Sequence, residues 1–465
     1  MQAPERVEGS FRDPAGQVFR SGDRIFRTIN ERAASDYEHV RDAGLLERFA
    51  KDGLLTGASE VDPELLGEDA QNARYVIEHP KIPFITFPYE WPFSVLKAAA
   101  LLHLDLHLRL IEHDVTLIDA SAYNIQFVGP KPTFIDTLSL RRYRDGEYWL
   151  GHQQFCDQFL NPLLLRAHLG LPHNAWYRGN LEGIPSTELA RLLPLRSKFS
   201  WRIASQVVLP AKLQRRAIDK ADQTPSKMPE RKLAKPGFKA MLTQLRNWIQ
   251  TLKPADVDKT VWQDYAQTHT YDDPEEQSKR DTVAAFVKDV KPDLLFDFGC
   301  NTGAYSALAL ESGAKSVIGF DMDQGALEGA FARAVKEDLF FLPLYLDAAN
   351  PSPAQGWSEA ERPGLSDRAS ADALLALAFI HHLAIGRNIP LDQLLAWLTG
   401  MAPEGIIEFV PKNDSTVQRM LSLREDIFSD YDVATFTTLL AKRAEIVDRK
   451  VVSASGRELF WYRRT

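Results

Sequence analysis

Glycines and an acidic residue surround the end of a predicted strand in the C-terminal half of the chain. The strand over residues 294–297 ends in Asp297, and the loop after it contains Gly299, Asn301 and Gly303. Glycine lets the backbone turn tightly and approach a ligand closely, while the helix that follows presents free backbone N–H groups. The loop therefore predicts a place where the backbone holds a ligand, although a glycine loop alone is weak evidence.

Aspartates end the next two predicted strands as well. Asp321, followed by Met322, ends the second strand, and Asp347, followed by Ala348, ends the third. A carboxylate at the end of the second strand can accept hydrogen bonds from both ribose hydroxyls, and Asp347 is placed to meet an adenine amino group. Each aspartate alone could instead cap a helix, but three strand ends on one sheet edge together predict a nucleoside site.

The spacing of the loop separates two classes of nucleoside-binding protein. Dinucleotide-binding dehydrogenases usually carry glycines as G-x-G-x-x-G, whereas here three residues separate the two glycines. Residues 297–303 resemble motif I of class I S-adenosylmethionine-dependent methyltransferases. A longer set resembles the bacterial methyltransferases grouped with nodulation host-specificity proteins: residues 350–353, 356–357, 361–362, 376–383 and 408–412. The resemblance implies S-adenosylmethionine as methyl donor and a Rossmann-like α/β domain with seven strands, the last antiparallel.

Candidate catalytic residues follow the fourth and fifth predicted strands. His381 and His382 come after the fourth strand, and Glu408 ends the fifth. A methyl transfer depends mainly on in-line positioning of the acceptor, and a hydroxyl or amine acceptor also needs a base near neutral pH. The alternative is that the histidines are structural and that Glu408 pairs with an arginine. We expect a small-molecule or glycan-type acceptor, whose identity the sequence leaves open.

A second constellation lies in the N-terminal half. Asp119 is followed five positions later by Asn124, and Asp136 comes twelve positions after that. The set resembles the catalytic and metal-binding loops of kinases, where such residues orient a hydroxyl and hold magnesium on ATP. However, Arg27 stands where kinases have a strand lysine, a poor substitute for it, and no glycine-rich phosphate loop is present. We expect a degenerate kinase-like α+β domain; turn and capping roles are the alternative.

Length and composition limit the remaining possibilities. The 465 residues carry a net charge of −8 and two cysteines, so we expect neither a disulfide framework nor a metal site. The net charge argues against bulk binding to nucleic acid or a membrane, although it leaves a local basic patch open. The N-terminal residues lack a signal-peptide pattern, and we expect a cytoplasmic protein. Its oligomeric state is left open.

These observations predict a kinase-like domain over residues 1–210, a basic linker and helix over 211–255, and a methyltransferase domain over 256–465. Residues 102–110 alternate with period two, yet we expect a helix there, with His103 and His107 one turn apart.

Two other functions remain open. One is a bifunctional or kinase-type phosphotransferase that uses Asp119, Asn124 and Asp136, and the other is a non-catalytic nucleotide-binding scaffold.

Overall fold

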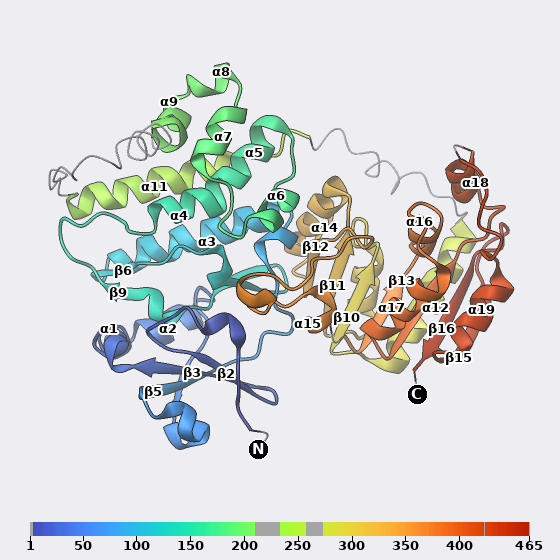
Figure 1. Ribbon diagram of the computed structural model, residues 1–465, viewed down its shortest axis with the longest axis horizontal. Coiled ribbons are helices and arrows are strands. Elements are labelled where there is room, and N and C mark those ends of the chain that lie inside the picture. The colour runs from blue at the N-terminus through green and yellow to red at the C-terminus, as the bar shows by residue number, and fades with distance from the viewer. Residues whose placement is uncertain (1–2, 210–232, 257–272, 370, 423, 465) are drawn as a thin grey trace. The chain divides into compact units, whose positions relative to one another are not determined.

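The computed structural model describes residues 3–209, 233–256, 273–369, 371–422 and 424–464 (Figure 1). The chain forms two compact units. The first contains Met1–Asp256 together with Ala354–Arg362, and the second contains Val257–Pro353 and Pro363–Thr465. A short segment of the C-terminal half therefore belongs to the first unit, which the expected boundaries did not include.

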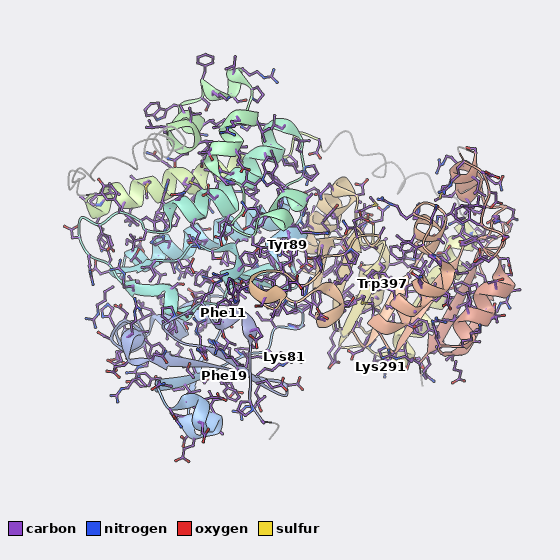
Figure 2. All side chains as sticks on the ribbon, viewed as in Figure 1. Phe11, Phe19, Lys81, Tyr89, Lys291 and Trp397 are labelled. Atoms are coloured by element: carbon purple, nitrogen blue, oxygen red, sulfur yellow. The ribbon has the colours of Figure 1, made fainter. Side chains whose placement is uncertain are left out.

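An antiparallel five-stranded sheet begins the first unit, in the order β1-β2-β3-β5-β4. Its two faces are both covered, since Phe26 and Val76 lie in one apolar cluster and Ile29 and Ile77 in another. Alternate residues of a strand point to opposite faces, so one sheet supplies both clusters. Phe19, on β2, joins the cluster of Phe26 (Figure 2). The elements of this part are β1 (Glu5–Arg6), β2 (Val18–Ser21), β3 (Arg24–Asn30), α1 (Glu31–Asp42), α2 (Leu45–Lys51), β4 (Ser59–Val61) and β5 (Ala73–His79).

A long helix, α3 (Phe93–Ile111), runs through the rest of the first unit (Figure 1). Helix α11 (Lys235–Thr251) packs on it: Lys97 Nζ donates to the carbonyl of Gln250 at 2.8 Å, and Arg246 pairs with Asp105 at 2.9 Å. The helix expected next to the linker thus belongs to the first unit. The other elements are β6 (Val115–Leu117), β7 (Ile125–Val128), β8 (Lys131–Phe134), β9 (Leu140–Arg142), α4 (His152–Phe155), α5 (Asn161–Leu169), α6 (Asn174–Gly179), α7 (Ser186–Leu192), α8 (Leu195–Lys198) and α9 (Trp201–Ile203).

The helical prediction for residues 102–110 is confirmed. Helix α3 buries residues around most of its circumference, which removes the usual apolar stripe and explains the misleading period-two pattern. His103 and His107 are both fully buried. His107 Nε2 lies 2.9 Å from Thr116 Oγ1 and accepts from the Leu117 N–H at 3.3 Å, so this histidine is neutral. Their surroundings are aromatic, and the pair is structural.

Buried histidines should make the first unit sensitive to acid. Burial lowers the pKa of His103 to about 4, whereas the unfolded chain has a value near 6.5. Between pH 6.5 and 4 the unfolded state therefore binds a proton at His103 that the folded state does not bind. The free energy of unfolding falls as the pH falls through this range. From pH 7.5 to 5, His103 alone should cost about 2 kcal/mol.

Urea unfolding at the two pH values tests this expectation. His103→Phe should show a pH-dependent loss about 2 kcal/mol smaller than wild type, because phenylalanine has no proton to bind. The exposed His113 supplies the control, and His113→Gln should behave as wild type. Equal losses in wild type and His103→Phe would contradict the assignment.

The second unit is built on a seven-stranded sheet in the order β12-β11-β10-β13-β14-β16-β15. The strands β12, β11, β10, β13 and β14 are parallel to one another. Strand β16 is antiparallel to both of its neighbours, β14 and β15. The predicted seven-stranded Rossmann-like sheet is confirmed. Its elements are α12 (Asp273–Val290), β10 (Leu294–Phe298), α13 (Ala304–Glu311), β11 (Ser316–Asp321), α14 (Gln324–Lys336), β12 (Phe341–Tyr345), α15 (Leu365–Arg368), β13 (Ala373–Ala376), α16 (Ile380–Ala384), α17 (Leu391–Met401), β14 (Glu404–Phe409), α18 (Ser415–Leu421), α19 (Val433–Ala441), β15 (Glu445–Val451) and β16 (Glu458–Arg463).

Helices cover both faces of this sheet. Apolar residues of α12, α13 and α14 share one core cluster with residues of the strands. On the other face, Trp397 of α17 packs against Phe298 with ring centroids 5.1 Å apart (Figure 2). Pro343 lies in β12 at the sheet edge, where its missing N–H costs no ladder hydrogen bond. Among the described helices, none is both long and apolar enough to cross a bilayer.

Candidate functional site

The loop after β10 adopts the conformation that its glycines allow. Gly299 and Gly303 have φ values of 79° and 76°, and Asn301 lies between them at 49°. A Cβ atom at position 303 would stand 2.4 Å from the ring of Phe341, so only glycine fits there. The turn brings backbone amides to the carboxyl ends of the strands, which is the expected place for a ligand in an open α/β sheet.

Asp321 faces this loop. Its Oδ2 accepts from the Asn301 N–H at 2.9 Å, and its Oδ1 accepts from the Asp323 N–H at 2.9 Å. The Leu346 N–H donates to the Asp321 carbonyl at 2.8 Å, so the end of β12 is held beside the end of β11. Asp347 follows directly, and its carboxylate lies 3.7 Å from Arg387. The three predicted strand ends are therefore neighbours.

The first of these carboxyl groups, Asp297, is fully enclosed. Burial raises its pKa to about 6, and the nearby charge of Asp321 adds to the rise. A hydrogen bond from Ser306 Oγ at 2.6 Å acts in the opposite direction. Burial also raises the pKa of Asp321, against the hydrogen bonds from the loop amides. Beside them, Met322 is half exposed and Ala348 partly buried. A cation bound at this edge would favour the charged forms of the two carboxyl groups, opposite to the effect of burial.

The two candidate histidines lie together on α16, with ring centroids 4.1 Å apart. Burial lowers the pKa of His381 well below its usual value, and His382 and Arg457 add to this. Burial lowers the pKa of His382 to about 4. Both rings are therefore neutral at pH 7 and can accept a proton. His381 Nδ1 is buried and has no hydrogen-bond partner within the described part of the chain.

Glu408 is held in a buried ion pair. Its Oε2 lies 2.7 Å from Lys279 Nζ and accepts from the Ala378 N–H at 2.9 Å. Arg457 approaches the other oxygen at 3.6 Å and binds Asp414 at 2.7 Å. A catalytic role for Glu408 stays a prediction, but these contacts favour positioning of the segment that leads to the histidines. The alternative expected for Glu408, a pairing with an arginine, is met by Arg457, whereas the pairing with Lys279 was not predicted. The sequence signal for that cation was the carboxylate itself, since a buried charge needs a partner.

Asp119, Asn124 and Asp136 also come together, in the first unit. Asn124 Nδ2 donates to Asp119 Oδ2 at 3.1 Å and lies 3.4 Å from Asp136 Oδ2. Arg27 lies 3.0 Å from Asp136 and also pairs with Asp13. The Leu138 N–H at 3.1 Å and the Ser139 hydroxyl complete the partners of Asp136. Both Asp136 oxygens are thus occupied, and this cluster does not fit a magnesium ion.

Comparisons with known proteins place the chain in a family. No protein-family model matches it. The nodulation protein NoeA of Rhizobium meliloti (strain 1021) is 50% identical over 465 residues, which cover 99% of this chain and 97% of that protein. The chain belongs to the NoeA family of nodulation proteins. The match extends over both units.

Other matches are partial. A ribosomal protein L11 methyltransferase of Colwellia psychrerythraea is 41% identical over 64 residues, 14% of this chain and 22% of that enzyme. Among solved structures, the N-methyltransferase NodS of Bradyrhizobium japonicum WM9 aligns with 42% of the NoeA-family chain and 98% of its own, at 16% identity and a TM-score of 0.31. A TM-score of 0.31 is too low to support an argument. We therefore assign the fold of the second unit from its strand order.

Because both oxygens of Asp136 already have partners within this NoeA-family chain, we expect magnesium not to bind there. Magnesium should not raise the melting temperature of the wild-type protein, because Arg27 already neutralises the Asp136 carboxylate. Arg27→Met should melt several degrees lower, since it leaves Asp13 and Asp136 without their cation. Magnesium should then stabilise that variant, as hard cations bind carboxylate oxygens. Differential scanning calorimetry with and without magnesium measures both effects.

Arg24→Met is the matched control, because Arg24 lies on the same strand and pairs with Glu78 at 2.6 Å, outside the cluster. It should show no magnesium response. A magnesium-dependent rise in wild type would mean that Arg27 yields its place to the metal.

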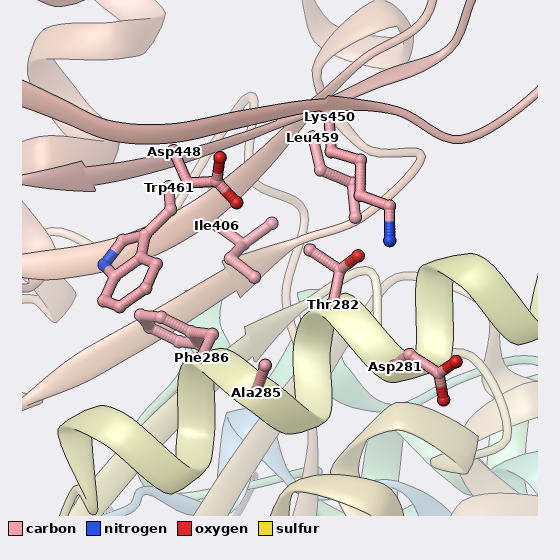
Figure 3. A pocket seen from close by; sticks show the side chains of 9 residues that line it. All are labelled: Asp281, Thr282, Ala285, Phe286, Ile406, Asp448, Lys450, Leu459 and Trp461. Atoms are coloured by element: carbon pink, nitrogen blue, oxygen red, sulfur yellow. The ribbon is translucent and has the colours of Figure 1, made fainter.

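A separate hollow of about 190 Å³ lies between α12 and strands β14, β15 and β16 (Figure 3). Phe286 of α12 and Trp461 of β16 stack edge to face in it, with centroids 5.4 Å apart. Its lining residues come from the sheet face and not from the ends of β10, β11 and β12. It is therefore distinct from the candidate nucleoside site. The lining consists of Asp281, Thr282, Ala285, Phe286, Ile406, Asp448, Lys450, Leu459 and Trp461.

Proposed function

We propose that the second unit is an S-adenosylmethionine-dependent methyltransferase that acts on a small-molecule or glycan-type acceptor. The observation that carries the proposal is the hydrogen bond from the Asn301 N–H to the Asp321 carboxylate. It joins a glycine-flanked loop and an acidic strand end at one edge of a parallel sheet, where open α/β sheets bind nucleosides. The partial match to an L11 methyltransferase supports the same reaction class.

The residues at this edge fit the cofactor. The loop of Gly299, Asn301 and Gly303 would hold its amino-acid part through backbone amides, and Asp321 would accept hydrogen bonds from the ribose hydroxyls. Asp347 would meet the adenine amino group. A ligand that carries a positive sulfonium would favour the charged forms of Asp297 and Asp321. When bound, the cofactor supplies a methyl group that is already activated for transfer.

The protein's own contribution is then mostly geometric. It orients the acceptor in line with the methyl group and keeps water out of the site. For a hydroxyl or amine acceptor a base is needed, and His381 Nδ1, neutral and without a partner among the described residues, can take that proton. Its low pKa makes it a weak base, so we assign most of the rate to positioning. His382 and Glu408 support the segment that carries His381.

For the first unit we propose a kinase-like arrangement that has lost metal-dependent phosphoryl transfer. The ion pair between Arg27 and Asp136 supports this proposal, because phosphotransferases of that kind need the carboxylate for magnesium. The Asp119 cluster is consistent with a nucleotide-binding or acceptor-binding role. Burial and the nearby charge of Asp136 raise the pKa of Asp119.

Incubation of the full chain with labelled methyl donor and bacterial metabolite extracts tests the main proposal. Mass spectrometry should find a methylated product and S-adenosylhomocysteine in equal amounts. Calorimetry should show binding of the methyl donor without any extract. A protein that binds neither the donor nor its demethylated product would contradict the proposal, and binding without turnover in any extract would favour a scaffold.

A further inference from the structure

An apolar and basic surface projects from the first unit at α7, α8 and α9. Four large side chains are strongly exposed within residues 192–201: Leu192 at 42%, Leu195 at 76%, Phe199 at 87% and Trp201 at 82%. Side chains with rings stand out from the ribbon at this end of the unit (Figure 2). Contiguous exposed apolar groups usually mark a binding surface. We call these residues and the cations among them the α8–α9 surface.

This exposure is part of a folded segment. Leu189 and Leu193 before α8, and Ile203 and Val207 after it, are all at most 2% exposed. The segment is therefore attached to the core on one side while it presents leucine and aromatic side chains to solvent on the other. Apolar side chains on two sides are expected of a segment that packs on the protein core with one side and binds another apolar surface with the other.

The α8–α9 surface is mainly basic, although α7 also carries the exposed Glu188 before it. Arg191, Arg196, Lys198 and Arg202 lie among the apolar residues, and residues 189–209 contain no aspartate or glutamate. Within the described ranges none of the four cations forms an ion pair, and the three arginines are exposed. A chain with a net charge of −8 thus carries a local basic patch, the possibility that the net charge alone had left open.

We propose that the α8–α9 surface docks the protein on an anionic phospholipid membrane. Clustered arginine and lysine residues are attracted to anionic headgroups. Leucine, phenylalanine and tryptophan beside them can enter the interfacial layer, and the long arginine stems extend their charge back to the headgroups. Single-stranded nucleic acid also attracts basic aromatic surfaces, but it stacks on ring faces and offers nothing to Leu192 and Leu195. The leucines therefore favour lipid.

Sedimentation of the full-length protein with vesicles tests the proposal. Wild type should bind vesicles of phosphatidylcholine with 30% phosphatidylglycerol in 0.1 M sodium chloride, and bind pure phosphatidylcholine at least tenfold more weakly. Phe199→Ala/Trp201→Ala should lower binding to the anionic vesicles at least tenfold. Arg196→Gln/Arg202→Gln should also lower it and should remove most of its dependence on salt.

Val335→Ala/Lys336→Gln is the control, because Val335 and Lys336 are an exposed apolar residue and an exposed cation at the end of α14, in the second unit. It should bind as wild type does. Circular dichroism should show the same fold for every variant, and binding of the methyl donor should be unchanged. Absence of wild-type binding to anionic vesicles would overturn the proposal. So would equal binding by Phe199→Ala/Trp201→Ala, tighter binding to polyuridylate than to the vesicles, or a dimer that these substitutions dissociate.

Discussion

Replacement of Asp321 by alanine should weaken binding of the methyl donor by about two to three orders of magnitude. Two hydrogen bonds from ribose hydroxyls to a carboxylate contribute about 3–5 kcal/mol together, and each 1.4 kcal/mol is a factor of ten in affinity. The substitution also removes the acceptor of the Asn301 and Asp323 N–H groups, so the loop after β10 loses its support. Isothermal titration calorimetry with S-adenosylmethionine measures the change.

Two further variants separate the ribose contact from a general disturbance of the loop. Asp321→Asn keeps one oxygen as an acceptor and should fall between wild type and alanine. Asp323→Ser should bind almost as wild type, because Asp323 caps α14 by accepting from Gly325 and Ala326, and serine can cap in the same way. Equal affinity of Asp321→Ala and wild type would remove the basis of the nucleoside site.

The second unit was predictable because its determinants are local. Each buried strand and its following helix have their own periodicity, and the parallel order brings the residues after successive strands to one edge. The positions of Asp297, Asp321 and Asp347 follow from that rule alone. Pro343 lacks the N–H that a central strand would need on both sides, and β12 is accordingly at the edge.

The remaining features depend on contacts between distant parts of the sequence. Glu361 accepts from Arg12 at 2.8 Å, and Arg362 lies over the ring of Tyr123 at 4.4 Å, so Ala354–Arg362 belongs to the first unit. The local sequence pattern of Ala354–Arg362 does not indicate that it contacts the N-terminal half, and the pattern around Arg12 and Tyr123 does not indicate it either. The pairing of Lys279 with Glu408 is of the same kind, because a strand reveals a buried carboxylate but not the helix that supplies its cation.

The Lys279–Glu408 pair should show the largest effect on stability in the second unit. Both side chains are almost fully buried, and their charged atoms lie 2.7 Å apart. Glu408→Met leaves the ammonium of Lys279 buried without its main partner, which costs about 3–5 kcal/mol. Lys279→Met should cost a similar amount. The double variant should lose much less than the two single losses together, since an apolar pair of similar volume often replaces a buried ion pair at little cost. Its remaining loss should come from the Ala378 N–H, which no longer has Glu408 as its acceptor.

Urea unfolding of the four proteins gives the coupling energy as a double-mutant cycle, and we expect at least about 3 kcal/mol. Lys315 and Asp293 are the control pair: they also lie 2.7 Å apart but are more than 70% exposed, so their coupling should stay below about 1 kcal/mol. Additive losses at Lys279 and Glu408 would mean that the pair contributes nothing beyond its single side chains. Methyl transfer by Glu408→Gln distinguishes the two roles of Glu408, because the amide oxygen can still accept from the Ala378 N–H. If Glu408 only positions the segment before His381, this variant should keep most of its turnover, whereas a proton acceptor at position 408 would leave a folded protein without activity.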